Sequence, residues 1–124
     1  ADIVQAVLEG VAFTIRDAVA CLAAADSACP SPGFIGGGAR SRLWAKIIAD
    51  ATGLMLRRYR GGDFGPALGA ARLAIIAATG APVADVCFPP PVAEEIAPDP
   101  ALFDAYTPRY ERFRDLYRAV APLF

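Results

Sequence analysis

The sequence of 124 residues contains no histidine, and its three cysteines are Cys21, Cys29 and Cys87. The absence of histidine excludes Ser-His and Cys-His nucleophilic catalysis. An odd number of cysteines without the spacing of metal ligands argues against zinc and for a reducing compartment, so we expect a cytoplasmic protein. Any chemistry in this chain must therefore depend on carboxylates or on bound ions.

Long apolar runs and a strong net charge are also missing. No apolar run reaches the roughly 18 residues needed to cross a membrane, and 12 basic residues against 13 acidic ones leave a net charge of −1. These features argue against a nucleic-acid or membrane partner. Hydrophobic residues nevertheless make up 56% of the chain, which is a high share for one domain. We therefore expect apolar surface that meets other protein, including another copy of the chain.

The length fits one compact domain with a core of its own. The chain begins at Ala1 without an initiator methionine or a signal-like segment, and helical periodicity starts almost at once. We therefore expect the sequence to be a piece of a longer protein.

The first half of the chain alternates helix and strand. Apolar residues recur every three or four positions over residues 3–22, which predicts a long helix with one apolar stripe and with Asp2 as its cap. Prolines then end the helical pattern, and Phe34 and Ile35 are predicted to end a short buried strand. A second strand is predicted over residues 54–60.

The helix between these strands is predicted to have Ser41 as its N-cap and Gly53 just after its end. A third helix is predicted over residues 66–79, closed by Gly80. The second helix should bury the residues Leu43, Trp44, Ile47, Ile48 and Ala51. Four small residues of the third helix, Ala67, Gly69, Ala70 and Ala71, predict close packing on the sheet or on the first helix.

The alternation of strand and helix predicts an α/β fold with a parallel strand pair joined by a right-handed crossover. Because a sheet of two parallel strands is poor, neighbouring strands are expected outside this chain. Residues 81–100 are rich in proline and acid and are predicted to be ordered coil. The C-terminal helix should start with Thr107 and Pro108. Its aromatic stripe, which indicates core or interface, comprises Tyr106, Tyr110, Phe113 and Tyr117.

Residues 34–44 read FIGGGARSRLW and join the first strand to the second helix through three consecutive glycines. Glycine adopts φ > 0 without steric cost, so Gly36, Gly37 and Gly38 could bring their N–H groups close to a phosphate. The start of the following helix favours an anion as well. A second interpretation is a tight turn between strand and helix, because the loop matches neither the dinucleotide nor the P-loop pattern.

Four segments together resemble the C-terminal end of the FGGY family of sugar kinases, most closely its xylulokinase branch. Residues 2–9 resemble the second half of the family's C-terminal signature, and residues 36–44 resemble its adenine-nucleotide loop and helix, which are the most diagnostic segment. Residues 61–74 look like the xylulokinase version of the next loop and helix, and the aromatic helix at 106–117 matches the family's closing helix.

The resemblance implies that residues 1–124 are part of the C-terminal nucleotide-binding domain of a sugar kinase, with a ribonuclease-H-like, actin-like ATPase fold. ATP would lie in a cleft between two domains, and the sugar would be held by an N-terminal domain that this chain lacks. The catalytic aspartate and the main Mg²⁺ site would also lie upstream, so no catalytic or metal-binding residue is assigned here. We expect the chain alone to be inactive.

Residue by residue, the resemblance implies that five positions face the nucleotide, namely Gly37, Gly38, Ala39, Ser41 and Arg42. Asp63 has two interpretations, a loop residue near the nucleotide or a helix cap. Glu9 and Arg16 are interpreted as structural. Asp50 lies near the C-terminal end of its helix, where an acid opposes the dipole, and could pair with a base or cap a loop.

Two other functions compete with xylulose phosphorylation. The gluconate, ribulose, glycerol and fuculose kinases share the glycine loop, and only residues 61–66 favour xylulose. The chain could instead be a non-catalytic module that binds a partner protein through its apolar face and aromatic helix.

Overall fold

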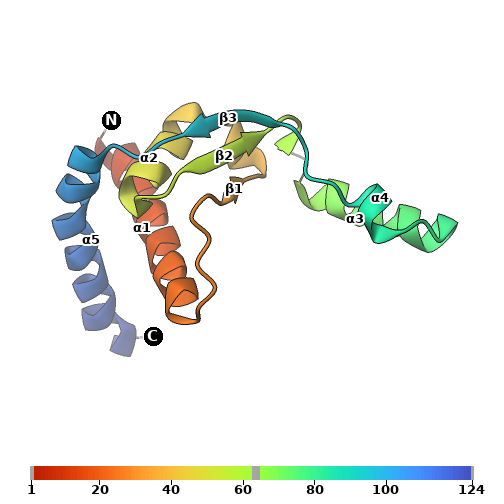
Figure 1. Ribbon diagram of the computed structural model, residues 1–124. Coiled ribbons are helices and arrows are strands. Elements are labelled where there is room, and N and C mark those ends of the chain that lie inside the picture. Colours follow the sequence, from red (N-terminus) through yellow and green to blue (C-terminus); the bar gives the residue numbers. More distant parts are fainter. Residues whose placement is uncertain (1, 63–64, 124) are drawn as a thin grey trace.

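The structure is a computed structural model that describes residues 2–62 and 65–123. The elements along the chain are α1 (Asp2–Ala24), β1 (Gly33–Phe34), the 3₁₀-helix η1 (Gly37–Arg40), α2 (Arg42–Thr52), β2 (Leu56–Tyr59), α3 (Gly65–Thr79), α4 (Val83–Val86), β3 (Val92–Ile96), α5 (Pro100–Val120) and the 3₁₀-helix η3 (Ala121–Leu123). In Figure 1, α1, α2 and α5 gather at one end of the small sheet, while α3 and α4 extend away from it. None of the described helices is both long and apolar enough to span a membrane.

The sheet contains the predicted parallel pair and one strand that the sequence pattern did not predict. β1 runs parallel to β2, and β3 pairs antiparallel with the other edge of β2. The prediction of coil over residues 81–100 is therefore wrong, because this region contains α4 and β3. Two oppositely charged cross-strand pairs, Arg57 with Glu95 and Arg58 with Glu94, hold β3 in register.

α2 lies at the centre of the core. Its caps are as predicted: the Ser41 hydroxyl accepts a hydrogen bond from the Trp44 N–H at 3.2 Å, and Gly53 adopts φ 73° while its N–H donates to the Ala49 carbonyl. Ile47, Ile48 and Ala51 are buried as predicted. Leu43 is 65% exposed, so its prediction as a core residue is wrong. Leu43 lies one turn before the buried Ile47 on the same stripe, but it precedes Ala45, the first buried residue of α2.

The apolar stripe of α1 is only partly used in this core. Ala12 and Phe13 are buried against α2 and α5. The preceding turns leave Ile3, Val4, Val7 and Val11 exposed. The chain therefore presents a continuous apolar row on the N-terminal half of α1.

α5 begins earlier than predicted. The Asp99 side chain caps it by accepting a hydrogen bond from the Ala101 N–H at 2.9 Å, Pro100 follows in the first turn, and Pro108 lies inside the helix. The assignment of Thr107 and Pro108 to the helix start is therefore wrong. Asp99-Pro100 and Thr107-Pro108 are both suited to a helix start, because each places a capping side chain before a proline. Only Asp99-Pro100 begins the helix, since α5 already runs through Thr107 and Pro108.

Three aromatic residues of the α5 stripe form core contacts, as predicted, whereas Tyr117 is 68% exposed and does not. The Phe13 ring lies 5.8–5.9 Å from the rings of Tyr106, Tyr110 and Phe113. The Arg16 guanidinium lies 4.4 Å from the ring centroids of both Phe103 and Tyr110. These contacts attach α5 to α1.

The predicted packing of α3 is wrong for this chain. No residue of α3 from Gly65 to Thr79 is buried, and the helix extends away from α1 and the sheet alongside α4 (Figure 1). Its small residues allow close approach to a backbone. Small residues do not determine which element packs against the helix. Here neither the sheet nor α1 buries a residue of α3.

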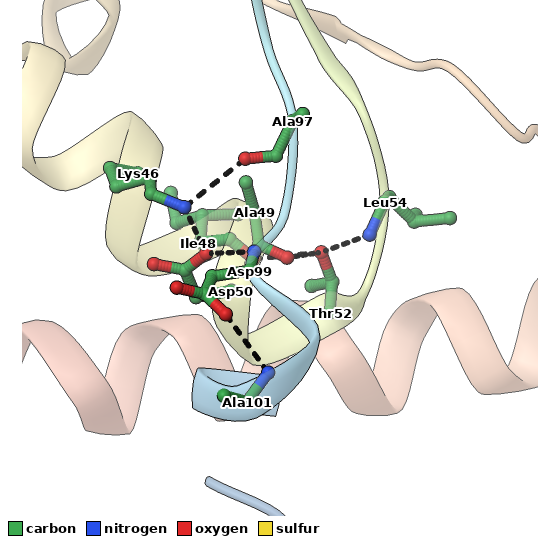
Figure 2. A network of polar contacts seen from close by, with 9 residues as sticks. All are labelled: Lys46, Ile48, Ala49, Asp50, Thr52, Leu54, Ala97, Asp99 and Ala101. Atoms are coloured by element: carbon green, nitrogen blue, oxygen red, sulfur yellow. Dashed lines mark hydrogen bonds and ion pairs between the residues drawn. The ribbon is translucent and has the colours of Figure 1, made fainter. Parts of the chain in front are cut away.

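A buried carboxylate connects α2 to the start of α5 (Figure 2). Asp50 is 2% exposed; its Oδ1 lies 2.5 Å from Lys46 Nζ and accepts a hydrogen bond from the Asp99 N–H at 2.7 Å. Lys46 also donates to the Ala97 carbonyl. The two interpretations left open for Asp50, pairing with a base and capping a loop, are both realised.

Candidate functional site

The glycine loop turns sharply directly after β1. Gly36 adopts φ 89°, a left-handed conformation that favours glycine, and its N–H donates to the Gly62 carbonyl at 2.8 Å. The Ala39 N–H then donates to the Gly36 carbonyl at 2.9 Å, which closes the first turn of η1. The loop is therefore tied to the segment that follows β2.

Gly37 and Gly38 lie in different surroundings. A Cβ on Gly37 would meet nothing within 4 Å, whereas a Cβ on Gly38 would lie 2.3 Å from Trp44 Cζ3. Gly38 is therefore required for packing on the indole ring, and Gly37 faces open space. Within the described residues, no acceptor is found for the N–H of either glycine. Such N–H groups at the start of a helical turn are suited to an anion.

The other three candidate positions have defined contacts. Ala39 is buried, and its carbonyl accepts a hydrogen bond from Arg58 Nε at 2.8 Å. The Ser41 hydroxyl caps α2, as described above. The Arg42 side chain is 74% exposed, and its Nε lies 2.6 Å from Glu94 Oε1.

A hollow of about 170 Å³ lies beside the loop. It is lined by Ala39, Arg40, Arg58, Tyr59 and Gly62. These residues follow or end the two parallel strands, and the carboxyl ends of parallel strands are where α/β proteins place ligands. Complete ligand pockets have volumes of about 300–1,000 Å³. This hollow therefore fits a phosphate or another part of a ligand.

Sequence reasoning missed Arg58, Tyr59, Gly62 and Glu94 as neighbours of the loop. A signal was present, because the basic pair Arg57-Arg58 and the acidic pair Glu94-Glu95 are complementary on adjacent antiparallel strands. This charge complementarity can be recognised only once the segment with Glu94 and Glu95 is known to be a strand. The candidate Asp63 lies outside the described residues.

Two residues interpreted as structural contact α5. Glu9 forms an ion pair with Arg109 at 3.2 Å. Arg16 Nη2 donates to the Thr107 hydroxyl at 3.2 Å. In the part of the chain that the structure describes, no group of three or more His, Cys, Asp or Glu side chains is placed to hold a metal ion.

Comparison with known proteins establishes the family. The model of the FGGY family of carbohydrate kinases, C-terminal domain, matches residues 1–78. The chain belongs to the FGGY family of carbohydrate kinases. The resemblance drawn from the glycine loop and its neighbouring segments is thus confirmed.

The FGGY chain is similar to several xylulose kinases. It is 42% identical over 123 residues to the xylulose kinase of Escherichia coli (strain K12), covering 98% of this chain and 25% of that protein. It is 37% identical over 124 residues to the xylulose kinase of Klebsiella pneumoniae, covering 99% of this chain and 26% of that protein. The chain therefore spans about a quarter of the length of the curated relatives that it matches.

Solved structures agree with the family assignment. The crystal structure of a "xyloylose kinase" from Brucella ovis aligns with a TM-score of 0.83 and 47% identity, over 98% of this chain and 25% of that one. The xylulose kinase from Rhodospirillum rubrum aligns with a TM-score of 0.72 and 33% identity, over 96% of this chain and 24% of that one. The predicted fold, an α/β piece of an actin-like ATPase domain, is confirmed.

Proposed function

We propose that residues 1–124 are part of the C-terminal nucleotide-binding domain of a kinase that uses ATP to phosphorylate D-xylulose to D-xylulose 5-phosphate. The family assignment supports phosphoryl transfer to a sugar. The names of the relatives favour xylulose over gluconate, ribulose, glycerol or fuculose. Such a metabolic kinase would act in the cytoplasm, with no nucleic-acid or membrane partner.

The observation that carries this proposal is the contrast between the two central glycines. Gly37 leaves open space on its Cβ side, next to N–H groups without an acceptor among the described residues. A phosphate or ribose oxygen of the adenine nucleotide would bind there, because backbone N–H groups stabilise anions without side-chain bulk. Gly38 would hold the loop in shape against Trp44 while its N–H faces the ligand.

The remaining candidate residues would act around this contact. Ala39 would face the nucleotide together with the two glycines before it. Its carbonyl would be held by the hydrogen bond from Arg58. Ser41 would position the N-terminus of α2 toward the anion through its cap. Arg42 uses its Nε for Glu94, and its side chain is 74% exposed, so its Nη groups would donate to a phosphate while the pair with Glu94 is kept.

Phosphoryl transfer needs more than this site provides. A base must take the proton of the sugar hydroxyl, and the transferred group must lie in line with it. Mg²⁺, when bound, neutralises charge on the phosphates. This chain would bind and orient the nucleotide, whereas sugar binding and proton removal would belong to the N-terminal part of a complete kinase. The 124-residue chain alone should therefore show no turnover of xylulose.

The test is isothermal titration calorimetry of the 124-residue chain with ADP and Mg²⁺. Half of a cleft should bind near the millimolar scale, about 4 kcal/mol, and Gly37→Ala should weaken binding because its new methyl group occupies the open space. Leu73→Gln on the distant α3 is the matched control. Binding that is equal in wild type and Gly37→Ala would reject this loop as the contact.

Self-association is the second part of the proposal. The exposed row of Ile3, Val4, Val7 and Val11 supports it, because contiguous apolar surface of this kind favours protein contacts. Sedimentation velocity at increasing concentration should show a dimer or larger species, together with binding of a hydrophobic dye. A concentration-independent monomer would contradict self-association. Tight self-association without nucleotide binding would favour the non-catalytic interaction module.

A further inference from the structure

Glu94 on β3 connects two arginines that come from different elements. Its Oε1 lies 2.6 Å from Arg42 Nε, and its Oε2 lies 2.7 Å from Arg58 Nη1. Arg58 in turn donates from Nε to the Ala39 carbonyl at 2.8 Å. The two ends of the glycine-loop segment, η1 and the first residue of α2, are thereby tied to one carboxylate on the neighbouring strand.

The charges explain why a carboxylate is needed at this place. Arg42 is the first residue of α2, where the helix dipole is positive and a cation is unfavourable. Arg58 brings a second positive charge to the same carboxylate. Without Glu94, two guanidinium groups would repel each other close to a positive helix end. A side-chain hydrogen bond from Arg42, joined by one from Arg58, outweighs desolvation and lowers the pKa of the Glu94 carboxyl below its usual 4.5.

Arg58 performs a task that lysine cannot perform in the same way. Its guanidinium donates from Nε to Ala39 and from Nη1 to Glu94, along two directions fixed by one planar group. Ala39 is 6% exposed, so its carbonyl needs a protein donor. The pair Arg57–Glu95 on the same two strands has similar chemistry, but within the described part of the chain neither side chain forms a hydrogen bond or ion pair with the loop.

We propose that Glu94 and Arg58 are positioning residues that hold residues 37–42 in the conformation that receives the nucleotide phosphates. This inference rests on the proposed nucleotide site. Neither residue needs to touch the nucleotide. Their effect passes through the Ala39 carbonyl and through Arg42, and it sets which way the Gly37 and Gly38 N–H groups point.

The experiment compares matched variants of the 124-residue chain, Glu94→Gln with Glu95→Gln and Arg58→Lys with Arg57→Lys. Titration with Mg-ADP should give a dissociation constant raised about five- to tenfold in Glu94→Gln and Arg58→Lys, as expected when about 1–1.4 kcal/mol of preorganisation is lost. Both control variants should bind within about twofold of wild type. Equal effects in the members of each pair would overturn the proposal.

Hydrogen exchange separates this inference from the proposed function. The amides of residues 38–42 should exchange at least threefold faster in Glu94→Gln than in Glu95→Gln, whether or not nucleotide is present. Equal exchange would overturn the positioning role. If wild type shows no nucleotide binding at all, the proposed site fails at this loop. If it binds and Glu94→Gln binds equally well, only the positioning role fails.

Discussion

The carboxylate of Asp50 accepts a hydrogen bond from the backbone N–H of Asp99 at 2.7 Å, although the two residues are 49 positions apart (Figure 2). Asp99 is the N-cap of α5. One buried side chain near the end of α2 therefore holds the backbone at the N-cap of α5. Lys46 neutralises this carboxylate from one turn earlier.

Asp50→Ala should destabilise the chain by about 2–4 kcal/mol, because it leaves the Asp99 N–H without its acceptor and removes the partner of Lys46. The measurement is urea unfolding followed by far-UV circular dichroism. Asp115→Asn is the control, since its pair with Arg118 is largely exposed and should be worth less than about 1 kcal/mol. A loss at Asp50 no larger than that at Asp115 would show that the bond does not stabilise α5.

Gly38→Ala should destabilise the chain by about 1–3 kcal/mol, because its Cβ would lie 2.3 Å from a Trp44 ring atom and force the indole to move. Trp44 is the only tryptophan, so fluorescence reports this movement directly. A Cβ on Gly37 would meet nothing within 4 Å, so Gly37→Ala should change stability by less than about 0.5 kcal/mol and is the control. Unchanged emission in Gly38→Ala would contradict the packing role.

Local chemistry predicted the parts of the fold that depend on neighbouring residues. Ser41 and Gly53 cap α2 as expected, because a hydroxyl acceptor and a left-handed glycine act within one turn. The loop from Gly36 onward was also predictable, because only glycine adopts its φ of 89° readily.

Features that depend on distant partners could not be predicted in the same way. β3 has the pattern apolar, apolar, acid, acid, apolar, which lacks the alternation of a half-buried strand. Its strand form depends on Arg57 and Arg58 in β2, far away in sequence. The surroundings of the glycine loop depend on the same pairing, so Arg58 and Glu94 could not be predicted as its neighbours.

Pro108→Ala should raise the stability of the chain by about 1–3 kcal/mol. Proline inside a helix removes one backbone hydrogen bond and costs about 3 kcal/mol relative to alanine, and Pro108 lies in the middle of α5. Thermal unfolding measures the gain. Pro100→Ala is the matched control, because proline in the first turn is already favourable. Similar shifts of the unfolding temperature in Pro108→Ala and Pro100→Ala would contradict a cost that is specific to proline in the helix interior.

Tyr110 should make the chain sensitive to alkaline pH. Burial, and then its hydrogen bond to the Asp17 carboxylate at 2.5 Å, raise the pKa of this phenol above 10.0. Because the folded state holds this proton more tightly than the unfolded state, the contribution is complete below about pH 10 and is lost as pH rises through the folded pKa. Tyr110→Phe should unfold with less pH dependence between about pH 9 and 12, and should be less stable by about 1 kcal/mol at neutral pH. Tyr117→Phe, at an exposed position of the same helix, is the control. Parallel stability profiles for wild type and Tyr110→Phe would contradict the linkage.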